Sequence, residues 1–145
     1  MADRILVLLT CILFVACGPI ILLPGGALDG SSSPSPNDWS WTDEVSTIQL
    51  ETRPEDPYSV NIWIVADRDK LYIHAGANRA TWIEHMEVYD AVRVQVEDRI
   101  FDLSATRVED QQEFDDFSDG YEKKYGVRPR HDSVQEAYLY RLMAR

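Results

Sequence analysis

Two pairs of β-forming runs occupy the middle of this sequence, and a short polar turn joins the members of each pair. In the first pair, residues 60–66 and 71–75 are near-continuous apolar runs. In the second pair, residues 91–96 and 99–108 alternate between apolar and polar side chains. Runs of this kind on either side of a short polar turn are typical of β-hairpins. The sequence therefore predicts two hairpins at the centre of the fold.

Two more segments complete the predicted set of strands. Residues 45–51 are rich in β-branched residues and end at a loop that contains Pro54 and Pro57. Residues 137–143 combine helix-forming Ala, Leu and Met with two alternating tyrosines, so propensity alone leaves strand and helix open. We predict a strand there.

Two other segments have the spacing of helices. Residues 79–86 lie between the hairpins, with Asn78 as the predicted N-cap. Their apolar face comprises Trp82, Ile83 and Met86. Residues 109–125 place aromatic side chains at spacings of three and four, and Gly126 follows as the predicted C-cap. The pattern predicts a crossover helix and a late amphipathic helix against the side of a small barrel.

The composition limits the size and the partners of this fold. The chain has 145 residues, of which 45% are hydrophobic, which is enough for one domain with a packed core. Its 25 acidic and 14 basic side chains give a formal charge of -11. That charge repels nucleic-acid phosphates and anionic lipid head groups. We therefore expect no nucleic-acid partner and no basic membrane-docking surface.

The first two dozen residues have the pattern of an export signal. No residue from 5 to 23 is charged. Residues 14–18 read Phe-Val-Ala-Cys-Gly, which resembles the lipobox of bacterial lipoproteins. The resemblance implies a signal peptide at 1–16, lipidation of Cys17 and, from the glycine that follows, export to the outer membrane. We expect a lipid-anchored envelope protein that faces the periplasm, with an uncleaved signal anchor as the alternative.

The cysteines and the next segment agree with export. The chain has two cysteines. Cys11 leaves with the signal and Cys17 carries the lipid, so no thiol remains for a disulfide or a nucleophile. Residues 24–38 are rich in Gly, Ser and Pro, which makes 17–38 a predicted flexible tether. The predicted domain covers residues 39–145.

The order of the elements, together with several short segments, resembles the flavin-binding split barrels. The segments are residues 59–66, 71–76 and 92–94, together with Arg79 and Trp82. The family comprises pyridoxamine-phosphate-oxidase-like and deazaflavin-dependent-nitroreductase-like proteins, and the likeness covers nearly all of 39–145. It implies an α+β protein, mainly β with helices: a six-stranded split β-barrel with one crossover helix and one late amphipathic helix. It also implies a homodimer that holds FMN or a deazaflavin.

The resemblance further implies where such a cofactor contacts the chain. The ring is expected near Asn61 and Trp63, and the phosphate near His74, Gly76, Asn78 and Arg79. An arginine beside a helix N-terminus supplies the donors that a phosphate needs. A glycine lets the backbone approach closely. Glu84, in the predicted crossover helix, repels a phosphate if its side chain faces the site.

Each candidate residue also has a structural interpretation. His74 is either a hydrogen-bonded wall residue of the barrel or a ligand. Together with His85 and His131 it forms the set from which a ligand for haem, the alternative cofactor, would come. These histidines match no metal-binding spacing, so we expect no metal site. Trp63 and Trp82 serve either a flavin by stacking or the core by packing.

The charged residues are open to two interpretations as well. The acidic run between 109 and 119 lacks the spacing of a calcium loop, so we predict a solvated helix face. Arg79 and Arg93 either bind phosphate or pair with the abundant acids.

Two hypotheses of different classes follow. The first is an exported, lipid-anchored flavin-dependent oxidoreductase, in which the cofactor supplies the chemistry and no catalytic side chain is assigned. The second is a cofactor-free ligand-binding or protein-interaction lipoprotein of the envelope on the same fold. An empty or blocked phosphate site, at the residues named above for the phosphate, favours the second hypothesis.

Overall fold

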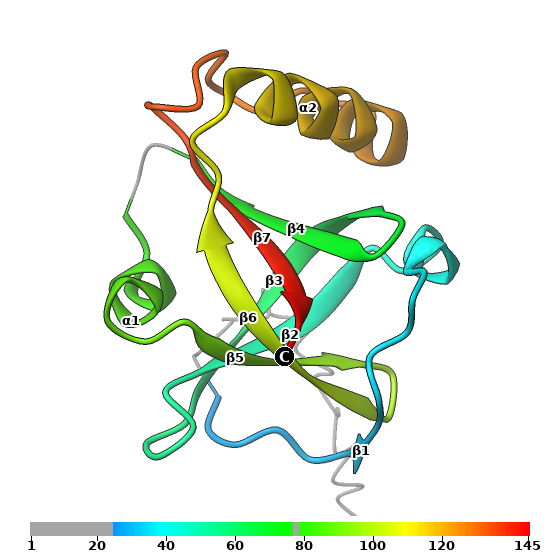
Figure 1. Cartoon of the computed structure of the whole chain (residues 1–145), viewed down its shortest axis with the longest axis vertical. Helices are drawn as coiled ribbons and strands as arrows, with labels where there is room; N and C mark the ends of the chain where they lie inside the picture. The colour runs from blue at the N-terminus through cyan, green and yellow to red at the C-terminus, as the bar shows by residue number, and fades with distance from the viewer. Residues whose placement is uncertain (1–24, 77–78) are drawn as a thin grey trace, which may run out of the picture.

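Six antiparallel strands close into a barrel in the computed structural model, which describes residues 25–76 and 79–145 (Figure 1). These six are β2 (Thr47–Thr52), β3 (Tyr58–Asp67), β4 (Lys70–Ala75), β5 (Ala91–Val96), β6 (Arg99–Arg107) and β7 (Tyr138–Ala144), and a seventh strand, β1 (Ser31–Ser32), lies at the edge. Around the barrel the order is β6-β5-β2-β3-β4-β7, and β7 pairs back onto β6. The short β1 pairs in parallel with the start of β6. The predicted fold class, the two hairpins and the final strand are confirmed.

The barrel interior is filled by the apolar side chains of alternating strand positions. In β5, Val92, Val94 and Val96 are buried, whereas Arg93 and Gln95 point outward and are only partly covered, as the period of two predicts. Trp39, from the loop before β2, is fully buried and packs edge-on against Phe101, with 4.9 Å between the ring centroids.

Two α-helices of the described residues lie outside the barrel (Figure 1). Helix α1 (Thr81–Val88) connects β4 to β5 and buries the predicted face of Trp82, Ile83 and Met86. Helix α2 (Gln111–Tyr125) follows β6 and packs over the outer side of β3, β4 and β7. The aromatic face predicted for this helix therefore builds a second apolar cluster between the helix and the barrel wall.

The caps of α2 agree with the sequence. Gly126 has a φ of 73°, the left-handed conformation of a helix C-cap that glycine adopts without strain. At the other end, the carboxylate of Asp110 accepts a hydrogen bond of 2.8 Å from the N–H of Glu113. The helix begins two residues later than predicted, because Asp110 is its N-cap.

Residues 25–33, within the segment predicted as a flexible tether, lie against the outside of the barrel. Gly25 exchanges two backbone hydrogen bonds, of 2.8 and 2.9 Å, with Ser59 of β3. The N–H of Leu28 donates to the carboxylate of Glu51 in β2, and β1 pairs with β6. The described part of the tether thus crosses several strands, because its backbone polar groups find partners on them.

Glu51 is the buried carboxylate beneath this segment. Its side chain is 1% exposed. Its two oxygens accept hydrogen bonds of 2.6 and 2.8 Å from Arg93 of the neighbouring β5. A carboxylate removed from water needs such partners to remain charged. Of the two interpretations of Arg93, pairing with an acid is confirmed.

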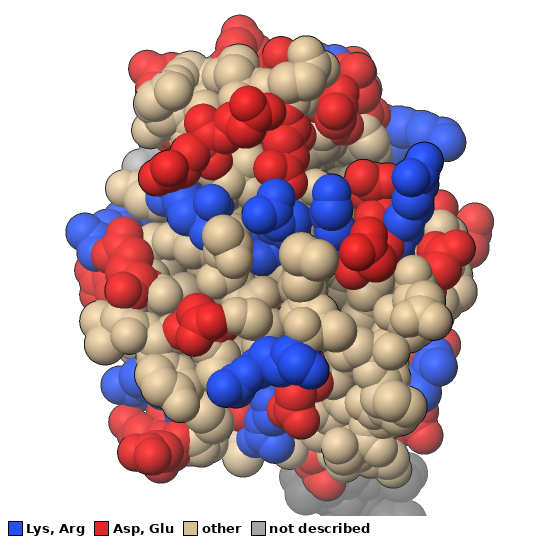
Figure 2. All heavy atoms as spheres, viewed as in Figure 1, with Lys and Arg blue, Asp and Glu red and all other residues tan. Residues whose placement is uncertain are grey.

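The acidic side chains gather over α2, as Figure 2 shows. Asp115, Asp116 and Asp119 are exposed there, which confirms the predicted solvated face. Glu113 departs from it, because its carboxylate accepts hydrogen bonds from Tyr72 and Arg141 of the barrel. Within the described ranges, no helix is both long enough and apolar enough to cross a bilayer.

Candidate functional site

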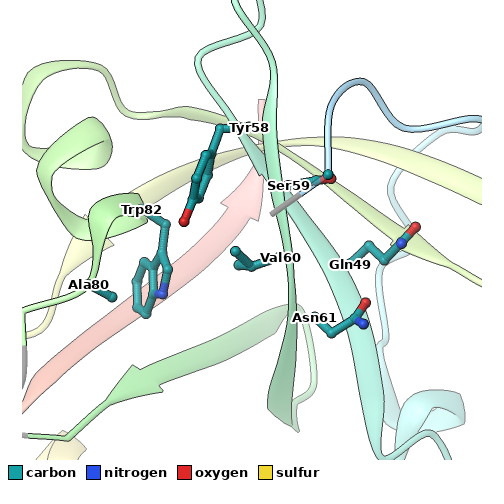
Figure 3. Close-up of a pocket in the computed structure, with 8 residues that line it drawn as sticks. Gln49, Tyr58, Ser59, Val60, Asn61, Ala80 and Trp82 are labelled. Atoms are coloured by element: carbon teal, nitrogen blue, oxygen red, sulfur yellow. The ribbon is translucent and has the colours of Figure 1, made fainter. Parts of the chain in front are cut away.

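A pocket of about 350 Å³ lies beside the first half of β3, near the start of α1. That volume falls in the range of small-molecule sites, roughly 300–1,000 Å³. The lining residues are Gly25, Gln49, Tyr58, Ser59, Val60, Asn61, Ala80 and Trp82. Figure 3 shows Tyr58, Val60, Ala80 and Trp82 on one side of β3, and Gln49 and Asn61 on the other.

The pairing of β3 explains why a pocket forms here. Its first half pairs with β2 from Tyr58 to Trp63, whereas pairing with β4 begins only at Ile64. Within 25–76 and 79–145, Gly25 at Ser59 is the one partner on the second side of this half. Backbone groups of a strand alternate in direction, so the N–H and C=O of Asn61 face the same side as those of Ser59. Asn61 therefore presents a backbone donor and a backbone acceptor to the pocket.

The lining is polar but carries no charge. Gln49 and Asn61 are cross-strand neighbours and contribute two carboxamides. Tyr58 and Trp82 contribute aromatic faces, a hydroxyl and an indole N–H. Aromatic side chains on one side of β3, together with donors and acceptors along its open edge, suit a planar heterocycle with lactam or imide groups. Most of the aromatic surface comes from Tyr58, because Trp82 is only 6% exposed.

The start of α1 borders the pocket at Ala80. Ala80 has the extended backbone of an N-cap, but no side chain caps the helix there. The sequence predicted Asn78 as the N-cap, and this was wrong, because Ala80 occupies the N-cap position. Asn78 itself lies outside the described residues. Burial of Trp82 and Ile83 fixes where the first helical turn begins.

Arg79 stands next to this helix start, as the resemblance implies, but it faces two acids of α1. Its guanidinium pairs with Glu87 and lies 3.7 Å from Glu84. All three side chains are substantially exposed. These three side chains, which we call the acidic corner, carry one positive and two negative charges, so the net charge of the corner is negative.

An aromatic cluster occupies the space between β3, β4 and α2. Trp63, which is 47% exposed, stacks on Tyr125 with 4.4 Å between the ring centroids and 11° between the planes. Tyr121 lies next to both rings and against His74. The cluster packs α2 onto the barrel, with Trp63 at its solvent edge.

His74 lies at the inner end of this cluster, against Phe117 and Tyr121. Burial lowers the pKa of His74 to about 4, and the neighbouring His131 adds to the shift. The imidazole is therefore neutral at neutral pH. Its Nε2 is buried and has no hydrogen-bond partner in the described part of the chain. His74 thus packs in the barrel wall, as one of its two interpretations predicted, but its Nε2 makes no hydrogen bond within the described residues.

Tyr125 fixes the point where β2 and β3 separate. Its hydroxyl accepts from the N–H of Ile64 at 3.0 Å and lies 2.8 Å from the carbonyl oxygens of Ile64 and Ser46. Burial raises the pKa of Tyr125 to about 12. The side chain thus replaces a missing rung of the β2–β3 ladder.

The structure divides the sequence-predicted site residues among several places. Asn61 lines the pocket, whereas Trp63 and His74 belong to the aromatic cluster and Arg79 to the acidic corner. Gly76 has open space where a Cβ would stand, so no described group approaches it closely. Asn78 lies outside the described residues.

Sequence reasoning missed Gln49 and Tyr58 as lining residues. Gln49 lies opposite Asn61 in the register of β2 and β3, a pairing that the sequence did not reveal. Tyr58 follows Pro57 at the start of β3, and such an aromatic residue after a proline loop was the available signal. His85, in α1, has a structural role, since its Nδ1 lies within hydrogen-bond distance, 2.8 Å, of the Thr52 hydroxyl.

Comparisons with known proteins find relatives of the fold alone. No protein-family model matches the chain. No curated protein matches it either. Among solved structures, the chain is similar to a candidate 5-nitroimidazole antibiotic resistance protein from Bacteroides thetaiotaomicron (TM-score 0.58, 16% identity, covering 72% of this chain and 75% of that one).

Two further structures give the same result. A candidate pyridoxamine 5'-phosphate oxidase from Listeria innocua has a TM-score of 0.57 at 14% identity and covers 72% of this chain and 87% of that one. A FAD-binding protein from Mesorhizobium loti has a TM-score of 0.51 at 13% identity and covers 73% and 86%. At these identities the likeness concerns the backbone, and the chain has the split β-barrel fold of these proteins.

Proposed function

We propose that this chain binds the ring system of a flavin in the pocket between β3 and α1 and acts as a flavin-dependent oxidoreductase of the bacterial envelope. A bound flavin supplies hydride-level redox chemistry, and the protein binds and orients it. The proposal is supported by the fold that the chain shares with a FAD-binding protein and a candidate pyridoxamine 5'-phosphate oxidase.

The uncharged pocket lining at the open half of β3 carries the proposal. An isoalloxazine ring is flat and has an imide edge with alternating acceptors and donors. The backbone N–H and C=O of Asn61, with the carboxamide of Gln49, match such an edge, and Tyr58 and Trp82 offer aromatic surface. These residues fit the ring. The phosphate of FMN fits less well, because no lining residue in the described chain is basic.

Export and anchoring are part of the same proposal. The lipobox-like residues 14–18, with Cys17 as the lipid site, lie outside the described residues. A lipid anchor at this cysteine, in the outer membrane and facing the periplasm, would hold the barrel at the envelope without any basic surface. We also propose a homodimer, as the resemblance to the flavin-binding split barrels implies.

The negative corner at Arg79 favours a second candidate function. If no flavin binds, the same pocket serves a cofactor-free envelope protein that binds another small heterocycle. Haem, the other cofactor considered, needs an axial ligand, and His74 is held under α2 rather than in the pocket.

A visible absorption spectrum of the full-length chain in mild detergent distinguishes these functions. We expect a flavin band that stays with the protein through gel filtration after incubation with riboflavin or FMN. Gln49→Leu should weaken the band, since it removes the carboxamide assigned to the imide edge and Gln49 is exposed. Thr106→Leu, at an exposed position of β6, should keep it. A colourless wild-type protein would contradict the proposed function.

A further inference from the structure

The ion pairs of Arg79 bear on which flavin the pocket accepts. Arg79 is the cation that the resemblance assigns to the phosphate, yet its guanidinium pairs with Glu87 and lies 3.7 Å from Glu84. Exposed pairs of this kind are individually weak, so Arg79 could turn away from either acid at little cost. The two carboxylates would remain, however, and a phosphate brought to this corner meets a net negative charge.

The partial positive charge at the N-terminus of α1 does not cancel the net negative charge near Arg79. A free helix N-terminus carries about half a positive charge. Glu84, in the first turn of α1, already uses that favourable position for a negative charge. No lining residue of the pocket, as far as the chain is described, is basic.

Another guanidinium, that of Arg107, lies near the aromatic neighbour of Trp82. Its Cζ lies 5.6 Å from the ring centroid of Tyr140, which packs edge-on against Trp82. Arg107 donates to the carbonyl oxygen of Ala137 at 2.6 Å and stacks on Tyr138, 4.5 Å from the ring centroid. The whole chain carries a formal charge of -11, so its long-range field also disfavours an anionic ligand.

We propose that the pocket selects uncharged flavins and related lactam heterocycles without a phosphate, with riboflavin as the model ligand. This inference rests on the proposed function and specifies its ligand class. The carboxamides, the Asn61 backbone and the two aromatic side chains bind the ring, while Glu84 and Glu87 exclude a phosphorylated side chain.

Parallel titrations of the full-length chain with riboflavin and FMN test the selectivity. We expect riboflavin to bind at least as tightly as FMN. Raising the salt from about 0.05 to 0.5 M should strengthen FMN binding by screening the repulsion and should leave riboflavin binding unchanged. FMN binding about tenfold tighter than riboflavin, or weakened by salt, would overturn the inference and leave the proposed function standing. Failure of both ligands to bind would overturn both.

A charge-neutralising double variant tests the role of the corner. Glu84→Gln with Glu87→Gln frees Arg79, and we expect FMN affinity to rise about tenfold, as one new charged hydrogen bond to phosphate would provide. Riboflavin affinity should not change. An unchanged FMN affinity in this variant would contradict the assigned role of the two acids.

Arg128 offers a matched control, because it also pairs with two acids, Asp119 and Glu122 of α2. The double variant Asp119→Asn with Glu122→Gln changes the net charge equally and frees an arginine that does not line the pocket. It should leave FMN affinity unchanged. An equal rise in both double variants would show that total charge, rather than the corner, sets the preference. A wild-type circular dichroism spectrum verifies that each variant folds.

Discussion

Single side chains replace missing backbone partners in this barrel. The hydroxyl of Tyr125 bonds to Ile64 where β2 and β3 separate, and Trp63 covers the tyrosine ring. A buried N–H without a partner costs free energy of folding. The Tyr125 hydroxyl therefore stabilises the fold in addition to the packing of its ring. The sequence identified Tyr125 as part of the apolar face of α2, but hydroxyl partners far along the chain leave no local pattern.

Removing that hydroxyl should destabilise the fold. We expect Tyr125→Phe to lower the free energy of unfolding by about 1–2 kcal/mol, because the N–H of Ile64 loses its acceptor. Urea titration measures the change. Tyr121→Phe is the control, since Tyr121 packs its ring in the same cluster and its hydroxyl makes no hydrogen bond within the described residues. Equal losses in the two variants would contradict the role of the Tyr125 hydroxyl.

His74 should make stability depend on pH. Its pKa in the folded chain is about 4 instead of 6.5, so between these values the unfolded chain binds the proton and the folded chain does not. Stability is therefore complete above about pH 6.5 and falls as the pH approaches 4, by on the order of 2–3 kcal/mol. His74→Gln should flatten this slope relative to wild type in unfolding titrations at pH 7 and pH 4.5. Parallel slopes would show that His74 does not cause the loss.

At the scale of elements, the sequence predicted type and order well and boundaries less well. The apolar and alternating runs predicted the other five barrel strands and both helices, and the strand predicted for the ambiguous final segment is confirmed. The start of α1 was misplaced, because its first turn is set by burial of Trp82 and Ile83 rather than by a capping side chain. The end of α2 was predicted correctly, because Gly126 is a local signal that tertiary contacts do not override.

The C-cap of α2 permits a direct measurement of that local signal. Gly126→Ala should cost about 1 kcal/mol, since alanine is strained at a φ of 73°. Gly26→Ala should be close to neutral, because Gly26 has no positive φ and open space at its Cβ. Thermal unfolding of the two variants makes the comparison. A larger loss for the Gly26 variant would contradict this account of the cap.

At the scale of the whole molecule, long-range pairing decided what the sequence could not. The pocket depends on where β4 stops pairing with β3, and the chain alone did not predict that register. Of the candidate residues that the structure describes, Asn61 and Trp82 line the pocket, whereas Trp63 and His74 lie against α2. Nor could the sequence single out Glu51 as the buried acid of the described residues.

The Glu51–Arg93 pair connects β2 to β5, and Glu51 also binds the N–H of Leu28. Substitutions of this pair therefore measure how much these long-range contacts stabilise the barrel. Arg93→Leu should destabilise the protein by about 2–4 kcal/mol, because it leaves a buried carboxylate without its cation. The double variant Glu51→Leu with Arg93→Leu should recover most of that loss in urea titrations. A double variant less stable than Arg93→Leu would mean that the pair itself stabilises the barrel.

The central claim is that a flavin ring binds between β3 and α1, and the four tryptophans can locate it by NMR. Riboflavin added to the full-length, ¹⁵N-labelled chain should shift the indole N–H signal of Trp82, which lines the pocket, and leave that of the fully buried Trp39 unchanged. A Trp63→Phe variant assigns the signal of the exposed tryptophan beside α2. A shift at Trp63 with none at Trp82 would place the ligand on the aromatic cluster and contradict this account.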